Sequence, residues 1–155
     1  MSTDVLERPA EAADEILVTL SVADQLCGIP VLGVRDVLGP QAITRIPLAP
    51  PEIAGSLNLR GRIVTAIDLR RRLRLAERPP EVSPMSVVVE QGGELYALLV
   101  DQVAEVMALS ADTFERNPPT LAATWKAVST GIYRLEGQLL LQLDVARLLT
   151  IEEGG

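Results

Sequence analysis

Histidine is absent from the 155-residue chain, and cysteine occurs once, at Cys27. Without histidine the chain has no imidazole to act as a base, a metal ligand or a phosphoryl carrier. A single cysteine excludes a disulfide within the chain and a zinc site built from several thiolates. We interpret Cys27 as a core residue, because it stands in an apolar stretch and lacks the base that activates a nucleophile. We therefore expect no metal site, no cofactor and no histidine-dependent catalysis, while an enzyme built from Asp and Glu alone stays open at this point.

Aromatic rings and positive charge are also scarce. The chain has one Trp, one Phe and two Tyr, although 48% of its residues are hydrophobic, so its core must be mainly aliphatic. Its 14 basic residues face 21 acidic ones, which gives a net charge of −7. Nucleic-acid binding needs clustered positive charge and stacking aromatic side chains. The composition therefore predicts a folded protein that does not bind nucleic acid.

Long apolar runs are missing as well. No stretch approaches the roughly 18–20 apolar residues that span a bilayer. Residues 1–15 carry mostly acidic charge, which is the opposite of a signal peptide. The charged residues of this segment are Asp4, Glu7, Glu11, Asp14 and Glu15 against Arg8. We expect a cytoplasmic protein that does not insert into the membrane and that begins with a flexible acidic tail, residues 1–15.

What the chain does contain is an internal duplication. The segment Ile53–Leu73 matches Ala127–Leu149 at an offset of 76, and an upstream segment matches at an offset of 69. The identical pairs are Gly55/Gly131, Leu59/Leu135, Gly61/Gly137, Asp68/Asp144, Arg71/Arg147 and Leu73/Leu149, with Val18/Val87, Leu26/Leu95, Val31/Val100, Val34/Val103 and Val37/Val106 upstream. One unit is therefore used twice, and a position that differs between the copies is a place to look for function. The main difference is Arg60, which faces Glu136.

The repeated unit is predicted to be a β-hairpin followed by a short helix. In each copy an x-Gly pair, Arg60-Gly61 or Glu136-Gly137, suits a tight hairpin because Gly accepts positive φ. The return strands are rich in Ile, Val and Leu, as strands are. Asp68 and Asp144 stand where these strands end, and each can accept hydrogen bonds from the first N–H groups of a helix. The same position in both copies favours a capping role over a catalytic carboxylate pair.

Prolines in the middle of each copy exclude long helices there. Each copy therefore reads as about five short strands with a short closing helix, which is typical of a small barrel. A unit of about 60 residues is marginal alone, so we expect two barrels that share a core. The sequence predicts an all-β fold with a first barrel at residues 16–78 and a second at residues 83–151, together forming one domain.

Four segments in order resemble the CheW-type chemotaxis coupling proteins. NLRG at Asn58–Gly61 followed by IVTAIDL at Ile63–Leu69 looks like the signature of that family. GIPVLGVRDV at Gly28–Val37, TRIP at Thr44–Pro47 and LLVDQVAEV at Leu98–Val106 fit as well. The resemblance spans Ile16 to Leu149. It departs in detail: Asp36 stands where Glu is usual, Thr65 where Pro is common, and Arg62 where an aliphatic residue is frequent.

The resemblance implies a fold and a function. The family fold is two packed SH3-like five-stranded barrels with short helices. Its members are non-catalytic adaptors that couple the cytoplasmic tip of methyl-accepting chemotaxis receptors to the regulatory domain of the CheA histidine kinase. It follows that this protein would be cytoplasmic and recruited to membrane-associated receptor arrays. Two alternatives stay open: a CheW-like scaffold of a parallel chemosensory pathway, and a small-ligand-binding barrel.

The resemblance also implies site residues. The receptor-binding residues would be Val34, Asp36, Val37, Arg60 and Val106, in an apolar groove between the barrels. The kinase-binding residues would be Gly55, Asn58 and Arg60. Arg60 and Asp36 should form an ion pair that orients the guanidinium group, because only the first copy has opposite charges at these two positions.

The basic run Arg70–Arg72, with Arg74, has two interpretations. The first is the solvated face of the short helix after Asp68, with Leu69 and Leu73 turned inward. The second is a surface for an acidic protein partner. We expect the solvated face.

Overall fold

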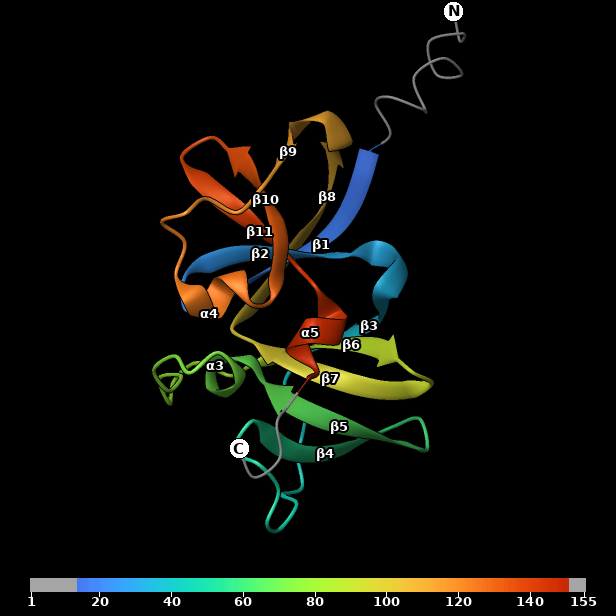
Figure 1. The fold of residues 1–155 in the computed structure, drawn as a ribbon. Coiled ribbons are helices and arrows are strands. Elements are labelled where there is room, and N and C mark those ends of the chain that lie inside the picture. The colour runs from blue at the N-terminus through green and yellow to red at the C-terminus, as the bar shows by residue number, and fades with distance from the viewer. Residues whose placement is uncertain (1–13, 151–155) are drawn as a thin grey trace, which may run out of the picture.

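The computed structural model describes residues 14–150, which form two β-sheets stacked one above the other (Figure 1). The upper sheet has six strands in the spatial order β8 (Gln102–Ser110), β1 (Asp14–Val22), β2 (Gln25–Pro30), β11 (Gln138–Leu143), β10 (Ser129–Leu135) and β9 (Phe114–Glu115). The lower sheet has five strands in the order β3 (Val34–Leu38), β6 (Met85–Gln91), β7 (Glu94–Val100), β5 (Arg62–Asp68) and β4 (Ile53–Leu59). The predicted all-β fold is confirmed, with the two-residue β9 as the sixth strand of the upper sheet.

Between residues 14 and 150 the helices are all short, as the prolines predicted. The α-helices of this range are α3 (Leu69–Arg72), α4 (Ala123–Lys126) and α5 (Val145–Leu148). Two single 3₁₀ turns precede edge strands, η1 (Val31–Gly33) before β3 and η2 (Ala111–Thr113) before β9. At the N-terminus, Asp14 and Glu15 already belong to β1, so they are not part of a tail. The remainder of the expected tail, residues 1–13, lies outside the described residues.

The two sheets do not follow the expected boundaries, 16–78 and 83–151. The first hairpin of the first copy, β1–β2, lies in the upper sheet with β8–β11 of the second copy. The first hairpin of the second copy, β6–β7, lies in the lower sheet with β3–β5 of the first copy. The copies have therefore exchanged their first hairpins. The division into two contiguous sequence ranges is corrected to two sheets of mixed origin.

The strand registers obey both sequence offsets. Val18 pairs with Ile29 in the upper sheet, as Val87 pairs with Leu98 in the lower sheet. The exchanged contacts obey them too, since Leu141 pairs with Cys27 as Thr65 pairs with Tyr96. The same pairs of repeat positions would meet whether each barrel were built from one contiguous copy or, as observed, from exchanged hairpins. The offsets therefore predict the pairing types but cannot tell which copy supplies each strand.

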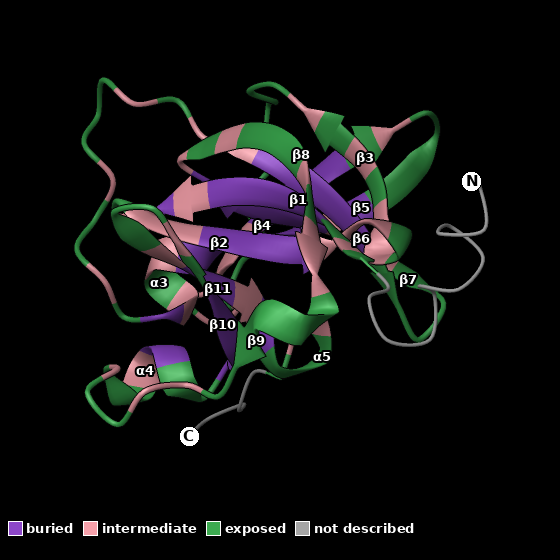
Figure 2. Cartoon of the chain, turned by 90° about the horizontal axis from the view of Figure 1, so that it is seen from above, coloured by how far each residue is buried: buried purple, intermediate pink, exposed green. Residues whose placement is uncertain are grey.

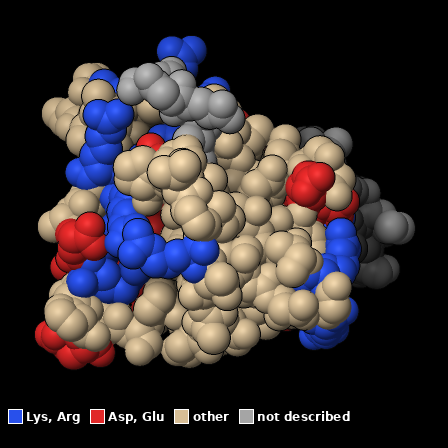
Figure 3. Space-filling model, turned by 90° about the horizontal axis from the view of Figure 1, so that it is seen from below, with Lys and Arg blue, Asp and Glu red and all other residues tan. Residues whose placement is uncertain are grey.

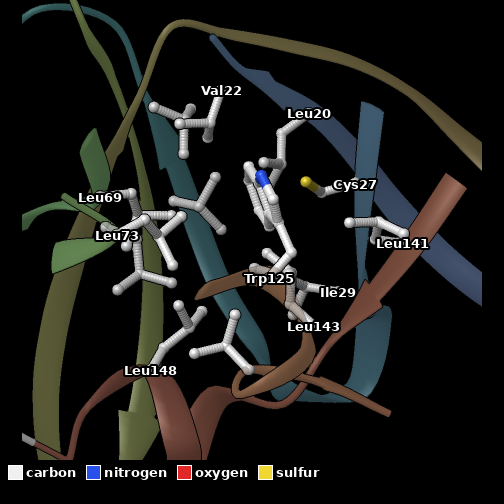
Figure 4. Packing of buried hydrophobic residues seen from close by; sticks show 14 of the residues in the cluster. Leu20, Val22, Cys27, Ile29, Leu69, Leu73, Trp125, Leu141, Leu143 and Leu148 are labelled. Atoms are coloured by element: carbon white, nitrogen blue, oxygen red, sulfur yellow. The ribbon is translucent and has the colours of Figure 1, made fainter. Parts of the chain in front are cut away.

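A shared core lies between the sheets, as expected for two marginal barrels. Its buried residues come from strands of both sheets and from the helices, with Trp125 of α4 beside Leu20 and Cys27 (Figure 4). Each sheet also encloses a smaller cluster, one around Val64 and Val88 and one around Leu17. Buried positions accordingly run along β1 and β2, while the turns are exposed (Figure 2). Because most apolar burial lies between the sheets, neither sheet is expected to be stable alone.

Candidate functional site

The expected ion pair between Arg60 and Asp36 is present. Arg60 Nη1 lies 3.1 Å from Asp36 Oδ2, and the side chains are 76% and 24% exposed. Asp36 is fixed from the other side, because its Oδ1 accepts a hydrogen bond from the backbone N–H of Val37 at 2.8 Å. The pair joins the β4–β5 hairpin to edge strand β3. The prediction that these two positions meet is confirmed.

The hairpin holds Arg60 in an unusual backbone conformation. Leu59 pairs with Arg62, so the turn has two residues, with φ of +52° at Arg60 and +86° at Gly61. Asn58 Oδ1 accepts a hydrogen bond from the Gly61 N–H at 2.9 Å, which braces the turn. A left-handed conformation at a residue with a Cβ costs about 1–3 kcal/mol. Within residues 14–150 the counterpart Glu136 is not among the residues with positive φ, so the copies differ in backbone as well as in charge.

A hollow of about 230 Å³ opens beside this pair. Its lining contains side chains of both charges and some apolar ones: Arg35, Asp36, Leu59, Arg60, Arg62, Val88, Glu90 and Leu95. Arg35 pairs with Glu90 at 2.8 Å, whereas Arg62 forms no ion pair with any residue of the described range. Three guanidinium groups thus face two carboxylates. The hollow suits a partner that brings carboxylates or backbone carbonyls.

Exposed aliphatic side chains lie on edge strands of both sheets and beside them. Val37 on β3 is 38% exposed, and its counterpart Val106 on β8 is 59% exposed. Val106 is opposite Val18 on β1, two residues from the exposed Ile16. Leu32, in the turn that connects the sheets, is 89% exposed. Exposed apolar surface of this kind is typical of partner sites.

The structure separates the predicted receptor-binding residues into three environments. Asp36 and Arg60 line the charged hollow, and Val37 and Val106 are exposed on the edge strands of different sheets. Val34 is half-buried and packs against the shared core. Val34 is therefore a poor probe of the surface, because a charge placed there would disturb the core. Sequence reasoning missed Ile16 and Leu32, since an apolar residue in a strand or turn carries no sign of its exposure.

The predicted kinase-binding residues lie on β4 and its hairpin. Asn58 and Arg60 are exposed, but Gly55 is buried. Gly55 has φ of +149°, and a Cβ there would lie 2.2 Å from the carbonyl oxygen of Thr44. Thr44 and Ser56 exchange backbone hydrogen bonds of 2.8 Å at this crossing. Gly55 is thus required by the close approach of the two backbones and offers no side chain to a partner.

A second set of exposed aliphatic residues lies on and beside the lower sheet. Ile63 projects from β5, and Ile46 and Leu48 lie in the loop before β4, where Leu48 has φ of +65°. Seen from below, charged side chains gather towards two sides of the molecule and leave an uncharged surface between them (Figure 3). This set could not be predicted from the sequence, because Leu48 follows Pro47 in a proline-rich loop and an apolar residue there is ordinary.

The basic run after β5 is a solvated face only in part. Arg71 and Arg74 are exposed and Leu69 and Leu73 are buried, as expected, but the expectation is corrected for Arg70. Arg70 Nη2 lies 2.7 Å from Asp101 Oδ2, and each of the two side chains is only 13% exposed. Arg78 reaches the same cluster, with its Nε 2.8 Å from Asp101 Oδ1 and its Nη2 3.3 Å from Asp68 Oδ1. Asp101 also accepts a hydrogen bond from the N–H of Ala23 in the β1–β2 turn. This buried clasp ties the upper sheet to the lower one.

Arg72 has a structural partner as well. It donates to the carbonyl oxygens of Leu148 and Arg147, which are the last carbonyls of α5. Cations stabilise a helix C-terminus in this way. The duplication held a signal for the clasp, since Arg70 and Asp101 differ together from their counterparts Ala146 and Leu32. Two positions that change jointly between copies indicate a contact.

The two aspartates that both copies of the repeat contain are helix caps, as predicted. Asp68 Oδ1 accepts a hydrogen bond from the Arg70 N–H, and Asp144 Oδ1 accepts one from the Arg147 N–H. Cys27 is buried, and burial raises the pKa of its thiol, so the thiol stays protonated in the core. Across residues 14–150 no three potential ligands among Cys, Asp and Glu gather to hold a metal ion. The helices of the same range are all too short or too polar to cross a bilayer.

These features define a duplicated two-barrel β protein whose distinctive surface is an ion pair on a strained hairpin. The family model described as a CheW-like domain matches residues 17–153. The chain therefore belongs to the CheW-like family.

Individual relatives cover nearly the whole chain. The chemotaxis protein CheW of Klebsiella aerogenes is 28% identical over 143 residues, which cover 92% of this chain and 86% of that protein. CheW of Treponema pallidum is 27% identical over 141 residues, covering 88% and 83%. The crystal structure of the scaffolding protein TtCheW from Thermoanaerobacter tengcongensis superposes with a TM-score of 0.81 at 29% identity, covering 90% of this chain and 94% of that chain. The likeness thus includes both sheets.

Proposed function

We propose that this protein is a non-catalytic adaptor that couples methyl-accepting chemotaxis receptors to a CheA-type histidine kinase. The family match over residues 17–153 and the similarity to proteins named as chemotaxis and scaffolding proteins support the proposal. The observation that carries it at the level of residues is the Arg60–Asp36 pair on a hairpin with positive φ.

The energetics of this pair favour a functional role over a stabilising one. An exposed ion pair contributes only about 0.2–1 kcal/mol to stability. The left-handed conformation at Arg60 costs about 1–3 kcal/mol, so the pair does not repay the strain. Asn or Gly at the same position would form this turn more easily. The arginine is therefore retained for what its guanidinium group contacts outside the chain.

The receptor surface in this proposal combines the charged hollow with the exposed aliphatic residues of the edge strands β3 and β8. An amphipathic receptor helix would place its apolar face against Val37 and Val106, and its polar groups would meet Asp36 and Arg60. Val34 supports this surface from the core side. The guanidinium fork of Arg60, oriented by Asp36, would bind carbonyl or carboxylate oxygens of the helix.

The kinase surface in this proposal is the β4–β5 hairpin. Asn58 and Arg60 would contact the regulatory domain of the kinase, while Gly55 allows the crossing with Thr44 that shapes β4. The protein would act in the cytoplasm, at membrane-associated receptor arrays. Its acidity, −7 overall, does not prevent this, because binding of a protein partner depends on local complementarity.

Two binding measurements test the proposal. The first is co-sedimentation of the protein with membranes that carry a chemoreceptor, and the second is binding to an isolated kinase regulatory domain. We expect binding in both, and loss of receptor binding for Arg60→Gly. A matched control is Arg134→Gly, which removes another exposed arginine paired with Glu115 on β9. Binding of neither partner by the wild-type protein would refute the adaptor function.

A further inference from the structure

A second hollow, of about 340 Å³, lies at the junction of the two sheets. Helix α5 lies over this junction (Figure 1) and forms one side of the hollow. The polar wall consists of Glu90, Gln91, Thr130, Gln142 and Asp144, and the apolar wall includes Ile29 and Leu143. Ala146 of α5 is exposed and also lines the hollow. None of the described residues that line it is basic.

The duplication supplies an occupied counterpart of this hollow. At the offsets of the repeat, Asp144 and Ala146 correspond to Asp68 and Arg70, and Leu32, which precedes the lining residue Gly33, corresponds to Asp101. In that copy the equivalent space holds the guanidinium groups of Arg70 and Arg78, which bind Asp101 and Asp68. The same backbone frame therefore encloses guanidinium groups in one copy and leaves space in the other.

The open copy has lost the arginines and kept a carboxylate. Ala146 replaces Arg70, and position 154, which corresponds to Arg78 at the offset of 76, is Gly. Asp144 still caps α5, but it has no partner equivalent to Arg78 among the described residues; its one ion pair is the local contact with Arg147 at 3.5 Å. Leu32, in place of Asp101, is exposed and turned to solvent.

An unsatisfied acceptor also lies in the wall. Gln142 Oε1 is buried and has no hydrogen-bond partner among the described residues. A buried acceptor without a partner costs about 1–3 kcal/mol, which a donor in the hollow recovers once the Gln142 amide turns towards it. The acceptors Gln142 and Asp144 are close along the chain, at the end of strand β11 and at the N-cap of α5. The hollow thus offers acceptors and apolar walls, and its described lining has no basic residue; Arg35 and Arg147, which pair with Glu90 and Asp144, are not part of that lining.

We propose that this hollow binds a guanidinium group, presented as an arginine side chain by a partner protein. The planar group donates to the Asp144 carboxylate and to the side-chain amide oxygen of Gln142. Its weakly hydrated faces lie against Ile29 and Leu143. A lysine ammonium is strongly hydrated and cannot donate as a flat fork, so it fits less well. That the arginine belongs to a partner protein rests on the adaptor function proposed above; the preference for guanidinium does not.

The direct test is an NMR titration of the ¹⁵N-labelled protein with N-acetyl-arginine methylamide, and with the corresponding lysine derivative as a control. We expect saturable shifts of the amides of Gln91, Gln142 and Asp144, with the lysine derivative binding about tenfold more weakly. Asp144→Asn keeps an N-cap residue and should also weaken arginine binding about tenfold. Equal binding of both derivatives, or no saturable shift in the wild type, would overturn the inference.

A variant that fills the hollow from within is the sharper test. Ala146→Arg restores the residue found in the occupied copy and should abolish binding of the arginine derivative. With Leu32→Asp added, it should rebuild the clasp, so the melting temperature of the double variant should exceed that expected from the two single variants. Independent effects of the two substitutions would show that the copies are not equivalent at this place and would overturn the inference.

The link to a partner is tested separately in a receptor-coupled kinase assay. Ala146→Arg should reduce coupling, while Ala146→Gln, which adds bulk without positive charge, should reduce it less. If wild-type protein couples and Ala146→Arg couples equally well, the hollow does not receive a partner's arginine. If wild-type protein fails to couple, the adaptor function is wrong, and the titration with the arginine derivative still decides the guanidinium preference.

Discussion

Arg60 Nη1 contacts Asp36 Oδ2 at 3.1 Å across two strands that do not pair with each other, β3 and the β4–β5 hairpin. The counterparts in the second copy are Glu136 and Glu105, which have the same charge and cannot form this pair. The duplication thus holds one ion-paired hairpin and one acidic hairpin in otherwise equivalent sheets. The difference predicts that the partner surface lies on the first hairpin.

Replacing Arg60 by glycine should separate function from stability. Gly adopts φ of +52° without strain, so Arg60→Gly should leave the melting temperature unchanged or raise it slightly. Receptor-coupled kinase activation should be lost, because the guanidinium group is gone. Calorimetry and the coupled kinase assay check the two halves. A large fall in melting temperature would mean that Arg60 holds the fold together.

Replacing Gly55 by alanine should destabilise the lower sheet. The added Cβ would lie 2.2 Å from the Thr44 carbonyl oxygen, and the backbone at φ of +149° disfavours a side chain. We expect a loss of about 2 kcal/mol or more in the free energy of unfolding, measured with urea. Gly39→Ala is the control, because its Cβ would meet nothing within 4 Å. Equal stability of the two variants would contradict the close-approach explanation.

The clasp should make the protein sensitive to acid. Burial would raise the pKa of Asp101, but hydrogen bonds from Arg70, from the N–H of Ala23 and from Arg78 outweigh it and lower the pKa from 3.8 to about 2. A carboxylate with a lowered pKa stabilises the fold above its unfolded pKa, so this contribution of roughly 2 kcal/mol is lost as pH falls from about 4 to about 2.

Urea unfolding of wild type and Asp101→Asn at about pH 5 and about pH 2 measures this effect. The variant should be less stable at the higher pH, by about 3 kcal/mol, since Arg70 loses its carboxylate partner and Arg78 keeps only Asp68. The difference should shrink in acid. Arg134→Ala, which breaks an exposed ion pair, should cost less than about 1 kcal/mol. A difference that is constant with pH would exclude Asp101 as the titrating group.

The two valines on β3 should respond differently to a charge. Val37→Glu places a carboxylate on an exposed position and should abolish receptor binding while circular dichroism stays native. Val34→Glu places it against the shared core and should lower the melting temperature markedly. Receptor binding that survives in Val37→Glu would move the receptor surface away from β3.

Much of the fold could be predicted because each copy repeats the same local signals. The hairpin at Arg60-Gly61 and the caps at Asp68 and Asp144 rest on local chemistry, and all are confirmed. The exchange of hairpins could not be predicted, because Val18 would meet an equivalent valine in either arrangement: Val37 if the barrels were contiguous, Val106 as observed.

The candidate site divides in the same way. The Arg60–Asp36 pair could be predicted because the two copies differ in charge at one position and agree at the other. The burial of Arg70 in an ion pair could not be predicted from its helix, since its partner Asp101 is 31 residues away and lies at the sheet junction. The exposure of Leu32 and the partial burial of Val34 depend on how the two sheets stack. The order of apolar and polar residues along one strand does not predict that stacking.

The most direct measurement of the central claim is the phosphorylation rate of a CheA-type kinase in the presence of receptor, with and without this protein. The adaptor function predicts that wild-type protein makes the rate depend on receptor, that Arg60→Gly does not, and that Arg134→Gly behaves as wild type. A rate that is the same with and without wild-type protein would contradict it.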